Sequence, residues 1–119
     1  MICLQETKAE NHIFPGPALA KLGFVHQHFQ GDKGYNGVAI LSRSEPLEVE
    51  RGFGDGGDET MARLVAARVG GVHVVSAYVP NGQEVGSDKW AYKLEWMKRL
   101  RAWLGEVPDR PVLVGRRHV

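Results

Sequence analysis

Two polar side chains that could bind a metal ion or an oxyanion lie where apolar runs of the sequence end. Glu6 follows the run Met1–Leu4 and Gln5, and a carboxylate at the end of a buried strand is placed where open sheets present functional groups. Such a carboxylate can bind a hard divalent cation such as magnesium. Tyr78 closes another apolar run, and its phenol can donate a hydrogen bond to a phosphate or to a leaving oxygen. From position alone, a surface glutamate and a tyrosine at the edge of the core remain the alternatives.

Other polar residues indicate chemistry less clearly. Asn81 lies in the turn Pro80–Gly82, where an asparagine more often serves the backbone than a ligand. His26 and His28 share a strand face, but no third metal ligand lies nearby, so two solvated strand residues are expected rather than a metal pair. The single cysteine, Cys3, excludes an internal disulfide and a cysteine-rich zinc site.

The composition is that of a globular chain with little net charge. The 119 residues are 43% hydrophobic and 24% charged, and 15 basic side chains against 14 acidic ones give a net charge of +1. This balance argues against a protein that binds polyanions by bulk charge, although it leaves room for a local basic patch. The sequence has no apolar run long enough to span a membrane and no secretory signal pattern. A cytoplasmic protein is therefore expected.

The polar candidates need strands to position them, and the sequence predicts mostly strands. Four strands are expected in the first half of the chain: Met1–Leu4, Phe24–Gln30, Val38–Leu41 and Leu47–Phe53. The third of these is a continuous apolar run, typical of a strand buried on both faces, and the fourth alternates like an edge strand. Two further runs, Arg63–Val69 and Val72–Val79, flank Gly70 and Gly71, which is a strong hairpin signal.

Two helices and a last strand complete the pattern. A short helix is expected over Phe14–Leu22, ended by Gly23. A longer helix over Lys89–Leu104 is expected to be capped by Asp88. Its apolar residues fill one broad arc of the helical wheel: Trp90, Leu94, Trp96, Met97, Leu100, Trp103 and Leu104. With a final strand at Pro111–Gly115, the pattern predicts an α+β or mixed α/β fold in which sheets face each other or are covered by helices.

Four short motifs occur in an order that resembles a known family. They are LQETK at Leu4–Lys8, GYNGVAILS at Gly34–Ser42, ARL at Ala62–Leu64 and YVPNG at Tyr78–Gly82. Each is weak alone, but together and at these separations they resemble the exonuclease III family of apurinic/apyrimidinic endonucleases. That family belongs to the endonuclease/exonuclease/phosphatase superfamily. The resemblance extends to Gly115, so it covers nearly the whole chain.

The resemblance implies a fold, a reaction and roles for residues. The fold is an α+β, four-layer α/β sandwich of two facing sheets with helices outside. The reaction is hydrolysis of DNA phosphodiesters at abasic sites and 3′ ends by an enzyme that uses Mg²⁺ or Mn²⁺, acts as a monomer and has no membrane partner. Glu6 matches the metal-binding glutamate, and Tyr78 matches the catalytic tyrosine at the scissile phosphate. Tyr35, Arg63 and Asn81 match DNA contacts, with a turn tyrosine and a solvated strand cation as the alternatives for Tyr35 and Arg63.

The sequence also departs from the family pattern. The family domain begins with a strand that ends in a Trp-Asn motif, and it continues after Gly115 with Asp-Phe-Asn. This chain starts at the next strand and has Arg116–Val119 in place of Asp-Phe-Asn, and an arginine cannot replace a carboxylate beside a metal. Residues 1–115 are therefore expected to form part of one family domain, without its first strand and C-terminal half, and residues 116–119 a divergent tail.

These departures leave several functions open. A chain with one carboxylate of the metal site and no general base is expected to be inactive by itself. The alternatives are a remnant that binds DNA without cutting it, or another phosphoesterase of the superfamily, for example one acting on lipid or inositol phosphates. The YVPNG motif at Tyr78–Gly82 argues against the last of these.

Overall fold

The computed structural model describes the chain except for residues 6, 8–14, 32–36, 58–61, 108–110 and 117–119. Within the described residues the chain forms strands and helices in an order close to the predicted one. They are β1 (Ile2–Gln5), α1 (Gly16–Ala20), β2 (His26–Gln30), β3 (Val38–Ser42), β4 (Leu47–Arg51), β5 (Leu64–Val69), β6 (Val72–Tyr78), α2 (Asp88–Glu106) and β7 (Val112–Arg116).

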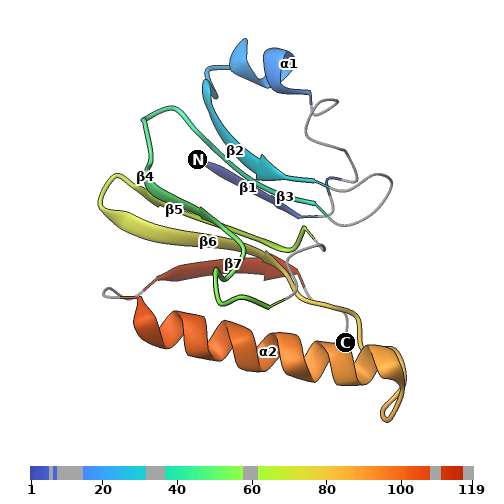
Figure 1. Cartoon of the computed structure of the whole chain (residues 1–119). Coiled ribbons are helices and arrows are strands. Elements are labelled where there is room, and N and C mark those ends of the chain that lie inside the picture. Colours follow the sequence, from blue (N-terminus) through green and yellow to red (C-terminus); the bar gives the residue numbers. More distant parts are fainter. Residues whose placement is uncertain (6, 8–14, 32–36, 58–61, 108–110, 117–119) are drawn as a thin grey trace.

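The strands form two sheets that face each other (Figure 1). The first has the order β1-β3-β2, and both of its strand pairs are antiparallel. The second has the order β4-β5-β6-β7, with β7 parallel to β6 and the other pairs antiparallel. Helix α2 covers the outer face of the second sheet (Figure 1), and Leu19 of α1 packs on Ala39 and Leu41 of the first. The predicted four-layer sandwich is thus confirmed, with β4 on a sheet edge as expected.

Successive side chains of each strand point to opposite faces of its sheet, and this alternation divides the core into layers. Val38 and Ile40 of β3 pack against Val65 of β5 and Val74 of β6, between the two sheets. Every residue of β3 is buried, because its other face is covered by α1 and neighbouring side chains. This agrees with the prediction from its continuous apolar run.

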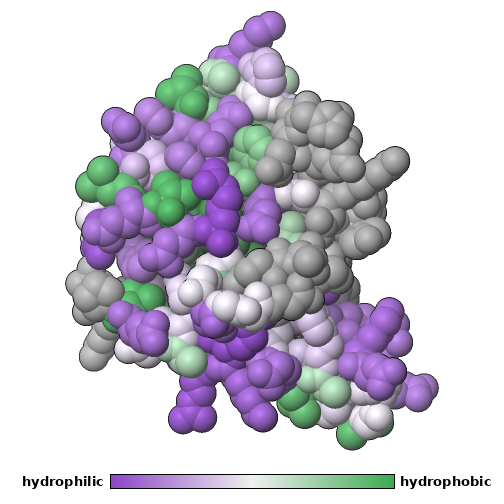
Figure 2. Space-filling view, viewed as in Figure 1, coloured by the Kyte–Doolittle hydropathy of each residue, from purple (hydrophilic) through white to green (hydrophobic). Residues whose placement is uncertain are grey.

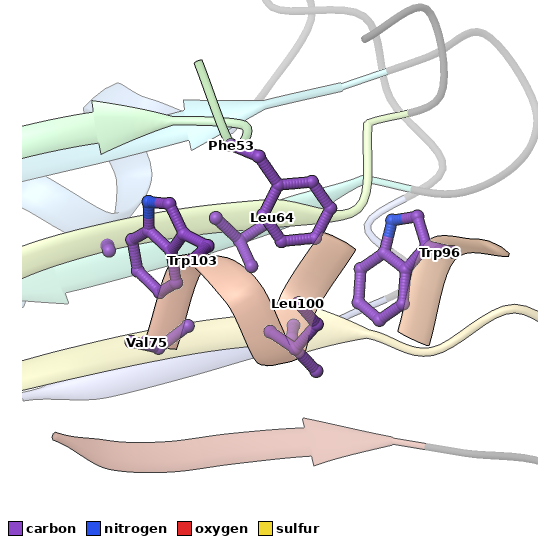
Figure 3. Close-up of a cluster of buried hydrophobic side chains, with 8 residues drawn as sticks. Phe53, Leu64, Val75, Trp96, Leu100 and Trp103 are labelled. Atoms are coloured by element: carbon purple, nitrogen blue, oxygen red, sulfur yellow. The ribbon is translucent and has the colours of Figure 1, made fainter. Parts of the chain in front are cut away.

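A second apolar cluster joins α2 to the four-stranded sheet (Figure 3). Trp96, Leu100 and Trp103 project from α2 onto the sheet and onto Phe53, whose ring centroid lies 5.3 Å from that of Trp96. The predicted apolar arc was too broad, since Leu94 and Met97 are 48% and 41% exposed. The buried face is narrower because it follows positions three and four residues apart along the helix.

Local signals explain the β5–β6 hairpin and the start of α2. Gly70 and Gly71 have φ angles of +57° and +82°, the left-handed conformations that a two-residue hairpin turn requires. The predicted cap of α2 was wrong by one residue. Ser87, not Asp88, is the N-cap, because its Oγ accepts a hydrogen bond of 3.2 Å from the Trp90 amide.

Among the described residues, no helix combines the length and the apolar character needed to cross a membrane.

Candidate functional site

Four strand ends meet at one end of the two sheets. The amide of Thr7, just after β1, donates to the Gly37 carbonyl at 3.3 Å, and the Gly37 amide, just before β3, donates to the Ala62 carbonyl at 2.9 Å. The Tyr78 amide at the end of β6 donates to the Arg63 carbonyl at 2.8 Å. This series of backbone bonds brings the ends of β1 and β6 together with the starts of β3 and β5.

A buried hydroxyl links the two sheets close to this end. Ser76 of β6 is fully buried, and its Oγ donates to the Leu4 carbonyl at 3.1 Å while accepting from Gln5 Nε2 at 3.0 Å. Both partners lie on β1. The hydroxyl therefore holds the end of β1 against β6, two residues before Tyr78.

Arg63 lies at this end of the sheets with its guanidinium buried beside two tyrosine rings. It is only 9% exposed, and its guanidinium carbon lies 5.0 Å from the centroid of the Tyr78 ring and 5.7 Å from that of the Tyr92 ring. Its Nη1 donates to the Tyr78 carbonyl at 3.2 Å. Its Nε is buried without a hydrogen-bond partner among the described residues. Because buried polar groups are normally paired, this guanidinium retains capacity for a further partner.

A pocket of about 430 Å³ opens beside Arg63. Its lining combines strand ends, the following turn and the first turns of α2: Arg63, Tyr78, Pro80, Asn81, Gln83, Asp88, Lys89 and Tyr92. Two cations and one carboxylate lie next to two aromatic rings. The cations favour an anionic group, and the aromatic rings favour a less polar group beside it. A sugar phosphate combines the two.

The turn after β6 is held in place by its own side chains. Asn81 Oδ1 accepts a hydrogen bond of 2.9 Å from the Gln83 amide, an Asx turn in which the side chain supports the backbone. Gly82 packs so tightly on α2 that a Cβ there would lie 2.6 Å from Trp90 Cε3. The Asx turn of Asn81 and the close packing of Gly82 thus fix this wall of the pocket, and the asparagine supports the backbone as the sequence predicted.

The family of the chain follows from its match to known proteins. A model of the Endonuclease/Exonuclease/phosphatase family matches residues 1–115. The chain belongs to this family. This match confirms the superfamily that the four motifs indicated, and the nucleases and the AP endonuclease to which the chain is also similar confirm the resemblance to the exonuclease III branch.

The family members to which the chain is similar include proteins named as nucleases. The chain is 32% identical over 117 residues to the DNA repair nuclease APEX1 of Danio rerio, covering 96% of this chain and 37% of that protein. It is 30% identical over 121 residues to exodeoxyribonuclease III of Haemophilus influenzae, covering 96% of this chain and 45% of that protein. The chain thus spans less than half the length of these relatives.

Solved structures of family members have the same fold. A 3′ phosphatase from Neisseria bound to a product DNA hairpin has a TM-score of 0.89 and 39% identity, over 95% of this chain and 45% of that one. An AP endonuclease from Archaeoglobus fulgidus has a TM-score of 0.85 and 41% identity, over 95% of this chain and 44% of that one.

The structure places three of the five predicted site residues of this family member in one pocket. Tyr78, Arg63 and Asn81 all line it, whereas Glu6 and Tyr35 lie outside the described residues. Their predicted roles remain predictions. Sequence reasoning missed Tyr92 as a site residue. Its position four residues before the buried Trp96 was a usable signal, because that spacing puts both side chains on the face of α2 that contacts the sheet.

The described residues do not by themselves form a metal centre. Among them, no group of three histidine, cysteine, aspartate or glutamate side chains could hold a metal ion. Asp88 lines the pocket together with Arg63 and Lys89, and this excess of positive charge suits an anion better than a cation.

At β2, the pKa of His28 is lowered by burial and, to a smaller extent, by the nearby charges of Arg51 and His26.

Proposed function

We propose that this chain forms part of the active site of a DNA repair nuclease of the exodeoxyribonuclease III type, which hydrolyses phosphodiesters at abasic sites and at DNA 3′ ends. The observation that carries the proposal is the pocket in which the buried Arg63 lies against Tyr78. Family membership supports it, as do relatives named as a DNA repair nuclease, an exodeoxyribonuclease III and an AP endonuclease.

In this proposal the pocket holds the DNA backbone next to the scissile bond. The Tyr78 phenol acts at the scissile phosphate, where negative charge develops in the transition state and donors aimed at that charge lower the barrier. Arg63, Tyr35 and Asn81 contact neighbouring parts of the DNA backbone. The cationic lining contributed by Arg63 and Lys89 is consistent with a phosphate occupant.

Glu6 is proposed as a ligand of Mg²⁺ or Mn²⁺, which would polarise a phosphate oxygen. Support comes from its sequence neighbours, because Gln5 is hydrogen-bonded to Ser76 and Thr7 to Gly37 at the end of the sheets that carries Tyr78. A single carboxylate holds magnesium weakly, so the 119 residues alone are expected not to cut DNA. The division into a family domain at 1–115 and a tail at 116–119, the monomeric state and the cytoplasmic location remain predictions.

A chimeric enzyme tests the proposed function. Residues 1–115 replace the matching segment of the Archaeoglobus fulgidus AP endonuclease, which supplies the remainder of the fold, and incision of a duplex with one abasic site is measured with and without Mg²⁺. We expect metal-dependent incision that is lost on Glu6→Ala and strongly reduced on Tyr78→Phe. Glu45→Ala, at an exposed glutamate, is the matched control and should leave incision unchanged. A folded chimera without incision, or one insensitive to Glu6→Ala, would refute the proposal.

A second candidate function is DNA binding without cleavage. The cationic lining of the pocket favours it for the isolated chain. The expected result is salt-dependent duplex binding by the 119-residue chain with no Mg²⁺-dependent incision. Clear incision by the isolated chain, lost on Glu6→Ala, would contradict this part of the proposal.

A further inference from the structure

The environment of Arg63 differs from that of Arg99, an arginine of α2. Arg99 also lies over an aromatic ring, with its guanidinium carbon 4.8 Å from the Phe53 centroid, but its charge is paired with Asp55 through bonds of 2.9 and 2.8 Å. Arg63 has two tyrosine rings and one backbone carbonyl as its described partners. A buried cation is costly when it is not neutralised, and no carboxylate among the described residues is paired with Arg63, so its charge is available to an incoming anion.

Tyr92 is placed to orient this guanidinium. It is half-buried on α2, where its ring packs against the cluster that contains Trp96, Leu100 and Trp103. Docking of the helix on the sheet therefore sets the position of the ring. Tyr78 lies near the guanidinium from β6 and Tyr92 from α2, so two separate elements confine the Arg63 side chain.

The first turn of α2 continues the same surface. Lys89 lies three residues before Tyr92, hence on the same side of the helix, and both line the pocket with Arg63. Hydrophilic residues cover much of the molecular surface in Figure 2, and the large exposed apolar side chains are scattered along the chain.

We propose that Tyr92 is a positioning residue for DNA recognition: it holds the Arg63 guanidinium against Tyr78 so that its donors face a backbone phosphate in the pocket. The start of α2 then belongs to the DNA-contacting surface, with Lys89 as an additional phosphate contact. This inference rests on the proposed function, because it assumes that DNA occupies the pocket. It assigns no chemical step to Tyr92, which acts through Arg63.

A double-mutant cycle on the 119-residue chain tests the inference. Binding to a short labelled duplex with one abasic site is followed by fluorescence anisotropy over a series of salt concentrations. Arg63→Ala should weaken binding about tenfold or more, since a hydrogen bond to a charged group is lost. It should also lower the slope of log K against log salt by about one phosphate contact. Tyr92→Leu should weaken binding about threefold, and Tyr92→Phe should restore it because the ring returns.

The pair of changes distinguishes positioning from general destabilisation. If Tyr92 acts through Arg63, Tyr92→Leu should have no further effect, within about twofold, in the Arg63→Ala background. Phe53→Leu is the matched control, because it removes an equivalent ring from Arg99 on the same helix without touching the pocket. It should lower the melting temperature but leave DNA affinity unchanged.

Three results would overturn the inference. They are an undetectable affinity of the wild-type chain for duplex at low salt, independent effects of the two substitutions, and an equal loss of affinity in Phe53→Leu. The proposed function is judged separately by incision in the chimera. An active chimera together with independent effects of Arg63→Ala and Tyr92→Leu would therefore reject only the role of Tyr92.

Discussion

Replacing Ser76 with alanine tests whether the two sheets are held together by a polar link rather than by apolar packing alone. The hydroxyl is fully buried and connects β6 to two groups of β1, the Leu4 carbonyl and the Gln5 side-chain amide. Alanine leaves both groups without this partner, and because Leu4 and Gln5 are half-buried, water replaces the hydroxyl only in part. Because each buried polar group that loses its partner costs about 1–3 kcal/mol, we expect Ser76→Ala to lower the free energy of unfolding by about 2–3 kcal/mol.

A second buried serine provides the comparison. Ser42 is 1% exposed, and its Oγ donates at 2.7 Å to the carbonyl of Ser44, an exposed residue two positions along the same segment. Water can replace the hydroxyl there, so Ser42→Ala should cost only about 1 kcal/mol. The two variants remove the same atom at equal depth and differ only in whether the bond crosses between the sheets.

Urea unfolding, followed by tryptophan fluorescence and by circular dichroism, measures both variants. With a typical urea dependence for a small protein, Ser76→Ala should lower the midpoint by about 1–2 M, and the slope should not change. In a Gln5→Leu background the cost should be smaller, because no side-chain amide is then left unpaired. Equal losses for Ser76→Ala and Ser42→Ala, or an unchanged cost in the Gln5→Leu background, would refute the reasoning.

Three further predictions concern the turn, the α2 core and the Asp55 contact. Gly82→Ala introduces a Cβ 2.6 Å from Trp90 Cε3, so we expect a loss of about 1–3 kcal/mol in thermal melts and weaker duplex binding; an unchanged affinity would show that the turn does not shape the pocket. Trp96→Ala empties the centre of the α2 cluster and should cost about 3–5 kcal/mol in urea unfolding, whereas a loss below about 1 kcal/mol would indicate that α2 is loosely docked. Hydrogen bonds from Arg99 and from the Gly57 amide hold the pKa of Asp55 well below its usual range. Its contribution to stability is therefore complete above about pH 4, the usual carboxyl pKa, and is lost as the pH falls towards the folded-state pKa. The stability difference between wild type and Asp55→Asn should be constant from about pH 5 to 8 and shrink in acid; a difference that grows in acid would contradict the sign.

Local sequence pattern predicted the strands and the hairpin, whereas the order of the four layers was implied by the family resemblance. A continuous apolar run such as that of β3 fits few structures other than a buried strand, and a glycine pair such as Gly70-Gly71 between two strand-like runs fits few structures other than a hairpin turn. The narrower buried face of α2 was not predictable, because whether Leu94 meets the sheet depends on how the helix is rotated when it docks. The N-cap was ambiguous for another reason, since Ser87 and Asp88 are both good caps and backbone conformation chose between them.

The candidate site was predictable in part. Residue types and the family resemblance indicated Tyr78, Arg63 and Asn81, which line one pocket. The approach of Tyr92 to Arg63 depends on the relative placement of α2 and β5, elements whose sequences are separated by a hairpin and a turn. The spacing to Trp96 places Tyr92 on the side of α2 that faces the sheet, but no local signal shows that it meets Arg63. The same holds for Asp55, whose partner Arg99 is 44 residues away.

The hairpin turn has a consequence for how this site can vary in evolution. Arg63 and Tyr78 face each other across the open end of the β5–β6 ladder, six residue pairs away from Gly70 and Gly71, or about 20 Å along the strands. A single inserted residue in that turn could be absorbed by a slip of the ladder, and such a slip turns every side chain of one strand to the opposite face. The two side chains of the pocket would then part without any change near them. The length of this distant turn should accordingly be as intolerant of insertions and deletions as the pocket residues are of substitution.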